Sequence, residues 1–360
     1  MTALLVVAIL VLLIIVHELG HFVAAKLSGV QVEEFGVGYP PRAFLLGVWG
    51  GTEYTLNWVP FGGFVRLYGD EGEGEHGRGS FVRSSRGRQA IILAAGVCMN
   101  LLAAWVIFAG ALHAGIPRAV DVFSPGAELV ISDVLPASPA EVGGLMPGDD
   151  ILSINDPSGA APASLSPQAI SDYVSERGGE KLSISFLRGS ATSSTTVIPA
   201  NAVIPGQAGR SALGIGLVLV SSDPLSWTGA FLGAFGAVWG ALVQITQSLW
   251  TIVLQALRAD IDLSDVVGPV GLVSVVGQAA HTGVAQVWAL AAFISVNLAV
   301  INLLPIPALD GGRLLLVAAE AIRRKPVSKL TIHILNLIGV ALIVLLMVVV
   351  TYNDIARLVT

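Results

Sequence analysis

The stretch IIVHELGHFVAA, residues 14–25, places two histidines and a glutamate inside an apolar segment long enough to cross a membrane. An ionisable side chain at the centre of a bilayer costs about 2.5–3.5 kcal/mol on insertion scales. His17 and His21 are four residues apart, so they project from one face of a helix, with Glu18 beside them. Two neutral imidazoles at this spacing can hold Zn²⁺, and a bound metal would offset the cost of inserting them. The stretch therefore predicts a metal site within a membrane helix.

The composition is that of a membrane protein. Of the 360 residues, 54% are hydrophobic and 12% are charged, whereas a soluble domain has about 25% charged residues. A membrane-spanning helix needs about 20 mostly apolar residues. The candidate stretches are 2–25, 89–112, 287–304 and 330–350, with a less uniform one at 227–257. The net charge of −6 says little about partners beyond the lipid bilayer, and we expect no nucleic acid among them.

The basic residues predict how the chain crosses the membrane. Seven Lys and Arg lie within 26–88 and five within 313–329, whereas the longer stretch 115–225 carries five. By the positive-inside rule the first two segments face the cytoplasm and the third lies outside. Four crossings fit this pattern, provided that 227–257 does not cross. We predict that this segment is a helix or helical hairpin associated with the outer leaflet.

The segment between the first two spans has strand character. In residues 52–70, TEYTLNWVPFGGFVRLYGD, Tyr54, Leu56 and Trp58 alternate on one side, and a turn is expected at 60–63. We predict a β-hairpin on the cytoplasmic side. Its aromatic side chains favour association with the membrane interface, although an ordinary small sheet is also compatible with the pattern.

One soluble-looking domain is expected at 127–205. Its sequence alternates strand patterns with two short helical patterns, which predicts a compact α+β module. The run ASPAEVGGLMPGDDILSIND resembles a PDZ domain. The fold class is therefore a membrane α-helical protein with about four transmembrane helices, a membrane-associated β-hairpin and an extracytoplasmic PDZ-like domain. The predicted divisions are a membrane core at 1–114, the PDZ-like domain at 127–205, the helical segment at 227–257 and a second membrane core at 268–360.

A catalytic zinc site needs a third protein ligand and an open position. Asp310 lies in NLLPIPALDGGR, residues 302–313, where two prolines end a helix and two glycines free the backbone. The predicted topology puts it at the cytoplasmic end of the membrane, where His21 also lies. A helix-capping role for Asp310 is the alternative. Four other histidines are candidates by residue type alone and lie in no comparable motif, namely His76, His113, His281 and His333.

These motifs together resemble the site-2 protease family. An HExxH motif in the first span, an NxxPxPxLDGG run after a later span and a single PDZ-like domain between them carry the likeness. GPVG at 268–271 and FGGFVRL in the predicted hairpin match the bacterial branch that performs regulated intramembrane proteolysis. The resemblance covers nearly the whole chain.

The resemblance implies a role for each matched residue. It implies a zinc metalloendopeptidase with Zn²⁺ held by His17, His21 and Asp310, and with Glu18 as the general base. Asn302 would position the substrate, although a packing role is also open for this amide. The further residues that we expect to bind substrate are Gly62, Gly63 and Phe64.

The resemblance also implies where the protein acts and on what. It implies a multi-pass protein of the bacterial cytoplasmic (inner) membrane that cleaves single-pass proteins, such as anti-sigma factors or remnant signal peptides. An upstream site-1-type protease would trim these substrates first. Two other classes stay open: an inert membrane scaffold that recruits peptides through its PDZ-like domain, and a metal transporter. A transporter would need polar residues in several spans, and 89–112 and 330–350 offer almost none.

Overall fold

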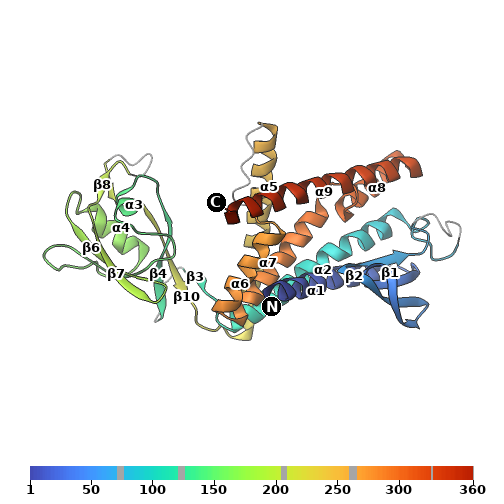
Figure 1. The fold of residues 1–360 in the computed structure, drawn as a ribbon, viewed down its shortest axis with the longest axis horizontal. Helices are drawn as coiled ribbons and strands as arrows, with labels where there is room; N and C mark the ends of the chain where they lie inside the picture. The colour runs from blue at the N-terminus through green and yellow to red at the C-terminus, as the bar shows by residue number, and fades with distance from the viewer. Residues whose placement is uncertain (71–76, 121–125, 204–208, 259–265, 326, 360) are drawn as a thin grey trace. The chain divides into compact units, whose positions relative to one another are not determined.

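The computed structural model describes residues 1–70, 77–120, 126–203, 209–258, 266–325 and 327–359 (Figure 1). The chain forms two compact units. One, here the membrane unit, comprises Met1–Ala114 and Leu225–Thr360; the other, here the inserted unit, comprises Gly115–Pro224.

The membrane unit is mainly helical. Its helices are α1 (Thr2–Leu27), α2 (Arg86–His113), α5 (Trp227–Leu257), α6 (Pro269–Thr282), α7 (Val284–Leu303), α8 (Asp310–Arg323) and α9 (Lys329–Val359). In the described part of the chain, five of these helices are long and apolar enough to cross a membrane, namely α1, α2, α5, α7 and α9. The protein is therefore a multi-pass membrane protein.

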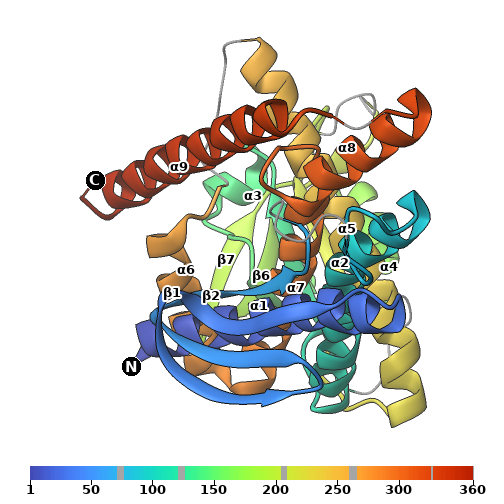
Figure 2. The same cartoon turned by 90° about the vertical axis from the view of Figure 1, so that its right-hand side faces the viewer.

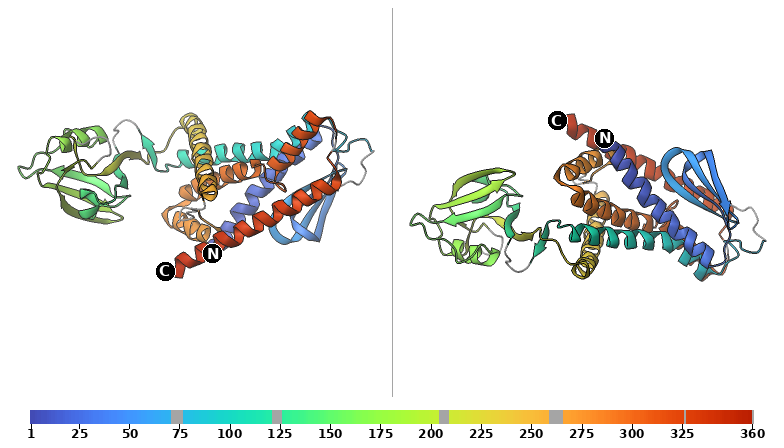
Figure 3. Two further views of the ribbon diagram at one scale, coloured as in Figure 1. Left: turned by 90° about the horizontal axis from the view of Figure 1, so that it is seen from above. Right: turned by 90° about the horizontal axis from the view of Figure 1, so that it is seen from below.

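Helix α2 lies at the centre of the membrane unit. It packs against α1, α5, α7 and α8, and Figure 3 shows α7 running alongside it. Ile92 and Leu93 of α2 are buried against Ala24 and Ala25 of α1. Helix α9, by contrast, exposes most of its apolar side chains, as a helix that faces lipid would. The helices that carry the predicted motifs thus pack directly on α2.

Segment 227–257 forms one continuous helix, α5, and not a helical hairpin. Its buried face packs against α2 and α7. Figures 1 and 3 show α5 running across the direction of α2. Gly233 of α5 lies against Leu112 of α2. A Cβ added at Gly236 or Gly240 would meet no atom of the described residues within 4 Å.

The sequence prediction of a hairpin within 52–70 is wrong. The hairpin joins β1 (Val32–Trp49) to β2 (Thr52–Leu67), and its turn lies at 50–51. Both long strands bend in the middle, and Phe35 of β1 pairs with Val65 on one side and Tyr54 on the other. The first half of β1 therefore separates the two halves of β2, which the prediction had paired. Figure 2 shows the two strands curving beside α1.

The inserted unit is an α+β module. Its six-stranded sheet has the order β3-β10-β4-β5-β6-β7, and β8 and β9 form a separate pair among the described residues. The strands are β3 (Arg118–Val120), β4 (Ala127–Val134), β5 (Asp150–Asn155), β6 (Leu182–Arg188), β7 (Ala191–Val197), β8 (Ala200–Asn201), β9 (Ser211–Ala212) and β10 (Ile215–Ser221). The helices are α3 (Pro139–Val142) and α4 (Pro167–Ser175).

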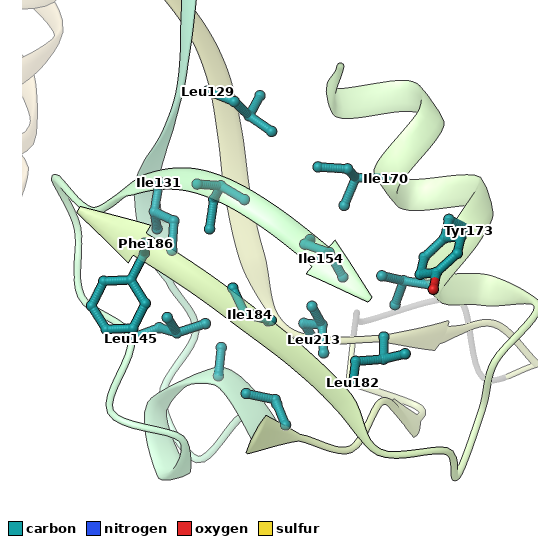
Figure 4. Close-up of a cluster of buried hydrophobic side chains, with 14 of the residues drawn as sticks. Leu129, Ile131, Leu145, Ile154, Ile170, Tyr173, Leu182, Ile184, Phe186 and Leu213 are labelled. Atoms are coloured by element: carbon teal, nitrogen blue, oxygen red, sulfur yellow. The ribbon is translucent and has the colours of Figure 1, made fainter. Parts of the chain in front are cut away.

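The core of the inserted unit lies between the sheet and its helices. Figure 4 shows Ile131, Ile154 and Ile184 of the sheet facing the same interior as Ile170 and Tyr173 of α4. The unit is larger than the predicted 127–205, because β10 inserts between β3 and β4. The prediction ended the module at 205 and assigned residues 206–226, which include β10, to no domain.

Candidate metal centre

The two HExxH histidines lie on the face of α1 that packs against α2. Four residues make slightly more than one helical turn, so both side chains lie on the same face. Because this face packs against α2, each histidine is only 7% exposed. Their Nε2 atoms are 3.1 Å apart. The sequence spacing therefore produces a pair of buried imidazoles that point to one place.

The LDGG turn brings Asp310 to that place. Helix α7 ends at Leu303 and α8 begins at Asp310. The chain between them doubles back so tightly that a Cβ on Gly311 would lie 2.1 Å from the carbonyl oxygen of Leu303, and one on Gly312 would lie 2.3 Å from that of Ile306. Asp310 is not the N-cap of α8, and α8 has no side-chain cap hydrogen bond. The carboxylate is instead turned toward the histidines.

Three ligand atoms converge at this point. Asp310 Oδ2 lies 3.0 Å from His17 Nε2 and 3.1 Å from His21 Nε2. Ligand atoms about 2.0–2.1 Å from a tetrahedral zinc lie about 3.3–3.4 Å from one another. Asp310 Oδ2 is buried and accepts no well-directed hydrogen bond from any described residue. The separations and the unsatisfied oxygen both fit a bound cation, and three protein ligands leave a fourth position open.

Helix α2 forms the wall behind the histidines. The His21 Nδ1–H donates to the carbonyl oxygen of Ile92 at 2.8 Å, which leaves Nε2 unprotonated for a metal. One turn further along α2, Gly96 allows the imidazoles to approach the helix. A Cβ on Gly96 would lie 2.4 Å from His21 Nε2 and 2.7 Å from His17 Cε1.

We expect Gly96→Ala to lower zinc affinity by about tenfold or more, because the added methyl group displaces both imidazoles. Gly87→Ala is the matched control, since no described atom lies within 4 Å of its Cβ position on the same helix. Zinc content after dialysis against a weak chelator compares the two variants. Equal zinc retention in both would contradict the packing of α2 against the ligands.

Glu18 points toward the β-sheet. It is half-buried, and its Cγ lies 3.4 Å from the Cβ position of Gly63 in β2. The register pairs residues 63–67 with the first half of β1 on one side only among the described residues. They therefore form a sheet edge beside Glu18. Gly62 and Gly63 are buried, and Phe64 is half-buried.

Glu34 connects the strand segments next to this edge through its side-chain contacts. It lies in the first half of β1 and is 4% exposed. Its carboxylate accepts a hydrogen bond from the Thr55 hydroxyl at 2.6 Å and pairs with Arg42 at 3.1 Å. A third, very short contact joins it to Arg66, on the edge segment itself. One buried carboxylate thus links both halves of each strand.

The other predicted residues lie as follows. Asn302 is in the last turn of α7, half-buried, and makes no side-chain hydrogen bond among the described residues. The His113 ring pairs with the carbonyl oxygen of Leu225 and stacks on Trp227. His281 and His333 are exposed, and the described cluster of possible metal ligands contains neither. His76 lies outside the described residues.

Sequence reasoning missed three residues behind the ligands: Gly96, Asn100 and Ser295. Asn100 is 1% exposed and Ser295 is 0% exposed. The Ser295 hydroxyl of α7 donates to the Asn100 carbonyl oxygen at 2.8 Å, and the Asn100 amide lies 3.4 Å from His17 Nδ1. Only Asn100 carried a signal, as the one amide among the apolar residues 90–112, since polar residues are costly in a membrane.

The chain is similar to known proteins over almost its whole length. It is 35% identical over 347 residues to a Clostridium perfringens protein named as a zinc metalloprotease, with 95% of each chain covered. It is 31% identical to a Rhizobium meliloti protein named in the same way, covering 96% of this chain and 94% of that one. Zinc metalloprotease RasP of Oceanobacillus iheyensis is 28% identical, with 96% of each chain covered.

Among solved structures, the PDZ domain of an SdrC-like protein from Listeria monocytogenes matches 27% of this chain and 93% of its own, at 24% identity and a TM-score of 0.22. The model of peptidase family M50 matches residues 5–346. Because this match spans the helices, the sheet and the inserted unit, the chain belongs to peptidase family M50.

Proposed function

We propose that this protein, a zinc metalloprotease of peptidase family M50, cleaves peptide bonds within or near the transmembrane segments of single-pass membrane proteins. The observation that carries the proposal is the convergence of His17, His21 and Asp310 on an apolar helix, with Glu18 beside them. Incubation of the purified protein with a transmembrane peptide, with and without a zinc chelator, tests it. Cleavage that a chelator leaves unchanged would oppose the proposal.

His17, His21 and Asp310 would hold the zinc ion. Zinc in such a site acts as a Lewis acid, polarising a carbonyl group and lowering the pKa of water. Glu18 would accept the proton of the attacking water and return it to the leaving amine. This complete set of residues favours an enzyme over an inert scaffold, which would need no carboxylate beside a metal site.

The sheet edge at 63–67 gives the substrate a place to bind. A transmembrane helix satisfies its own backbone hydrogen bonds, so the segment to be cleaved must unwind. An extended segment can pair with an exposed strand edge, and this edge lies beside Glu18. Gly62, Gly63 and Phe64 would contact the substrate there, and the side-chain amide of Asn302 would bind its backbone.

We further propose four crossings of the cytoplasmic membrane, by α1, α2, α7 and α9, with the inserted unit outside. The orientation of α5 across α2 supports a helix that lies along the outer leaflet (Figure 3). The basic segments 26–88 and 313–329 would then both face the cytoplasm.

The four-crossing arrangement predicts that both ends of α5 are accessible from outside. Ser222→Cys and Arg258→Cys, each in a Cys98→Ser background, should react with an impermeant thiol reagent in intact cells. Gly87→Cys, in the segment expected inside, is the control and should react only after permeabilisation. Opposite accessibility of positions 222 and 258 would mean that α5 crosses.

The inserted unit would act outside the membrane, as a PDZ-like domain that controls which substrates enter. An upstream site-1-type protease would first remove the bulky outer domain of the substrate. A folded unit of about 110 residues has a radius of gyration of about 13 Å, large enough to obstruct an untrimmed substrate. A PDZ-like domain that recruits the new chain end is the alternative.

Excision of the inserted unit distinguishes a domain that excludes untrimmed substrates from one that recruits trimmed substrates. The points at which the chain leaves and re-enters the membrane unit are adjacent, because the Leu225 N–H donates to the Leu112 carbonyl oxygen at 3.1 Å. A short glycine-serine linker can therefore replace 115–224. We expect the variant to cleave a trimmed substrate at the wild-type rate and also to cleave the untrimmed precursor. If the variant instead cleaves the trimmed form more slowly and does not cleave the precursor, the inserted unit recruits trimmed substrates.

A further inference from the structure

The two metal-facing histidines differ in how their second ring nitrogen is held. A neutral imidazole that binds a metal through Nε2 carries its proton on Nδ1 and donates it to an acceptor. For His21 that acceptor is the carbonyl oxygen of Ile92, at 2.8 Å. For His17, the polar group recorded near Nδ1 is the side-chain amide of Asn100, whose Nδ2 is 3.4 Å away.

With Nδ2 facing the ring, the Asn100 amide would donate to His17 Nδ1. The ring proton would then sit on Nε2, where a metal ligand needs a lone pair. The same orientation leaves Asn100 Oδ1 buried and without a hydrogen-bond partner among the described residues. The tautomer conflict disappears if the amide is turned by 180°, since the two orientations have nearly the same shape. Oδ1 then accepts the hydrogen bond from the His17 Nδ1–H.

The Asn100 backbone is fixed independently of its amide. The Ser295 hydroxyl, on α7, donates to the Asn100 carbonyl oxygen at 2.8 Å. Both residues are fully enclosed, at 1% and 0% exposure, and α2 packs closely on α7. A hydrogen bond from α7 therefore anchors α2 at the residue that faces His17.

We propose that Asn100 is a positioning residue for the metal centre, which holds His17 in the tautomer that presents Nε2 to the metal. The inference rests on the proposed zinc site and deepens it. Asn100 contacts neither substrate nor metal in this role; it acts through His17. An amide that merely fills space between α2 and α7 would have no influence on metal binding beyond its volume.

The test compares Asn100→Leu with Asn100→Asp in the full-length protein in detergent. Leu keeps nearly the branched shape of Asn and removes the acceptor, whereas Asp keeps an acceptor in either orientation of its carboxylate. Zinc affinity is measured by competition with a chromophoric chelator, and the Co²⁺-substituted protein gives an absorption spectrum that reports ligand geometry. We expect Asn100→Leu to bind zinc about 10–100-fold more weakly and to alter the Co²⁺ spectrum, and Asn100→Asp to match the wild type in both.

The outcomes are distinguishable. Wild-type affinity in Asn100→Leu, or equal losses in Asn100→Leu and Asn100→Asp, would overturn the positioning role while leaving the zinc site intact. Failure of the wild-type protein itself to bind zinc would instead overturn the proposed metal centre. Thermal unfolding of the metal-free variants separates misfolding from weak binding: a Leu variant that unfolds at the wild-type temperature yet binds zinc weakly supports the proposal.

Discussion

Glu18→Gln is expected to reduce peptide cleavage by about 10²–10⁴-fold, the usual contribution of a general acid–base group. The glutamine amide has almost the shape of the carboxylate but cannot accept a proton from water. The three proposed ligands are untouched, so zinc should remain bound at the wild-type level. The measurement pairs the cleavage rate of a transmembrane peptide with the zinc content of the same preparation.

Glu176→Gln is the charge-matched control, because this exposed carboxylate lies on the inserted unit at the end of α4. It should leave both cleavage and zinc unchanged. Loss of zinc in Glu18→Gln would show that Glu18 holds the metal and would contradict the division between base and ligands. Full activity in Glu18→Gln would show that Glu18 takes no part in the reaction.

Asp310→Ala is expected to lose both zinc and activity. The substitution leaves two imidazoles, whereas a catalytic zinc site uses three protein ligands, so zinc affinity should fall by more than about 100-fold, beyond the effect of losing an outer-shell partner. The fold should survive, because Asp310 does not cap α8. Metal analysis of the purified variant measures the loss of zinc, the peptide-cleavage assay measures the loss of activity, and circular dichroism shows whether the fold is retained.

Asp172→Ala removes an exposed carboxylate from α4 of the inserted unit and should retain zinc and activity. Full zinc content in Asp310→Ala would show that a residue other than Asp310 supplies the third ligand. A partial loss that zinc excess restores would agree with the proposed role, since mass action compensates for weak binding.

The meeting of the HExxH and LDGG motifs was predictable because each motif carries its own local geometry. Four-residue spacing sets the histidines on one face of α1, and the prolines and glycines around Asp310 enforce a tight reversal. The positive-inside rule then put both motifs at the same end of the membrane. These inferences needed no knowledge of how the helices pack.

The β-sheet was less predictable. Alternation within 52–70 indicated strands, but a period of two does not say which segment pairs with which. The partner segment 32–49 carried glycine and two prolines that obscured its strand pattern. Pairing there also depends on Glu34, whose three partners are spread over residues 42–66.

The support behind the ligands could not be read from the sequence. Asn100 lies 83 positions from His17, and Ser295 lies 195 positions from Asn100. Asn100 is a single amide among the apolar residues 90–112, whereas Ser295 shares α7 with Gln286, Asn297 and Asn302. The helical period assigns each residue to a face of its helix but does not identify its partner. Gly96 likewise resembles any small residue of a membrane helix until the imidazoles are seen against it.

The most direct test of an intramembrane zinc protease is the position of the cleaved bond. The protein is reconstituted in liposomes with a single-pass peptide, and the products are identified by mass spectrometry, with chelator, with chelator followed by zinc, and with Glu18→Gln. We predict a cut inside the apolar segment that stops with chelator, returns with zinc and is lost in Glu18→Gln. A cut far from the apolar segment, or one that persists both in chelator and in Glu18→Gln, would contradict the account.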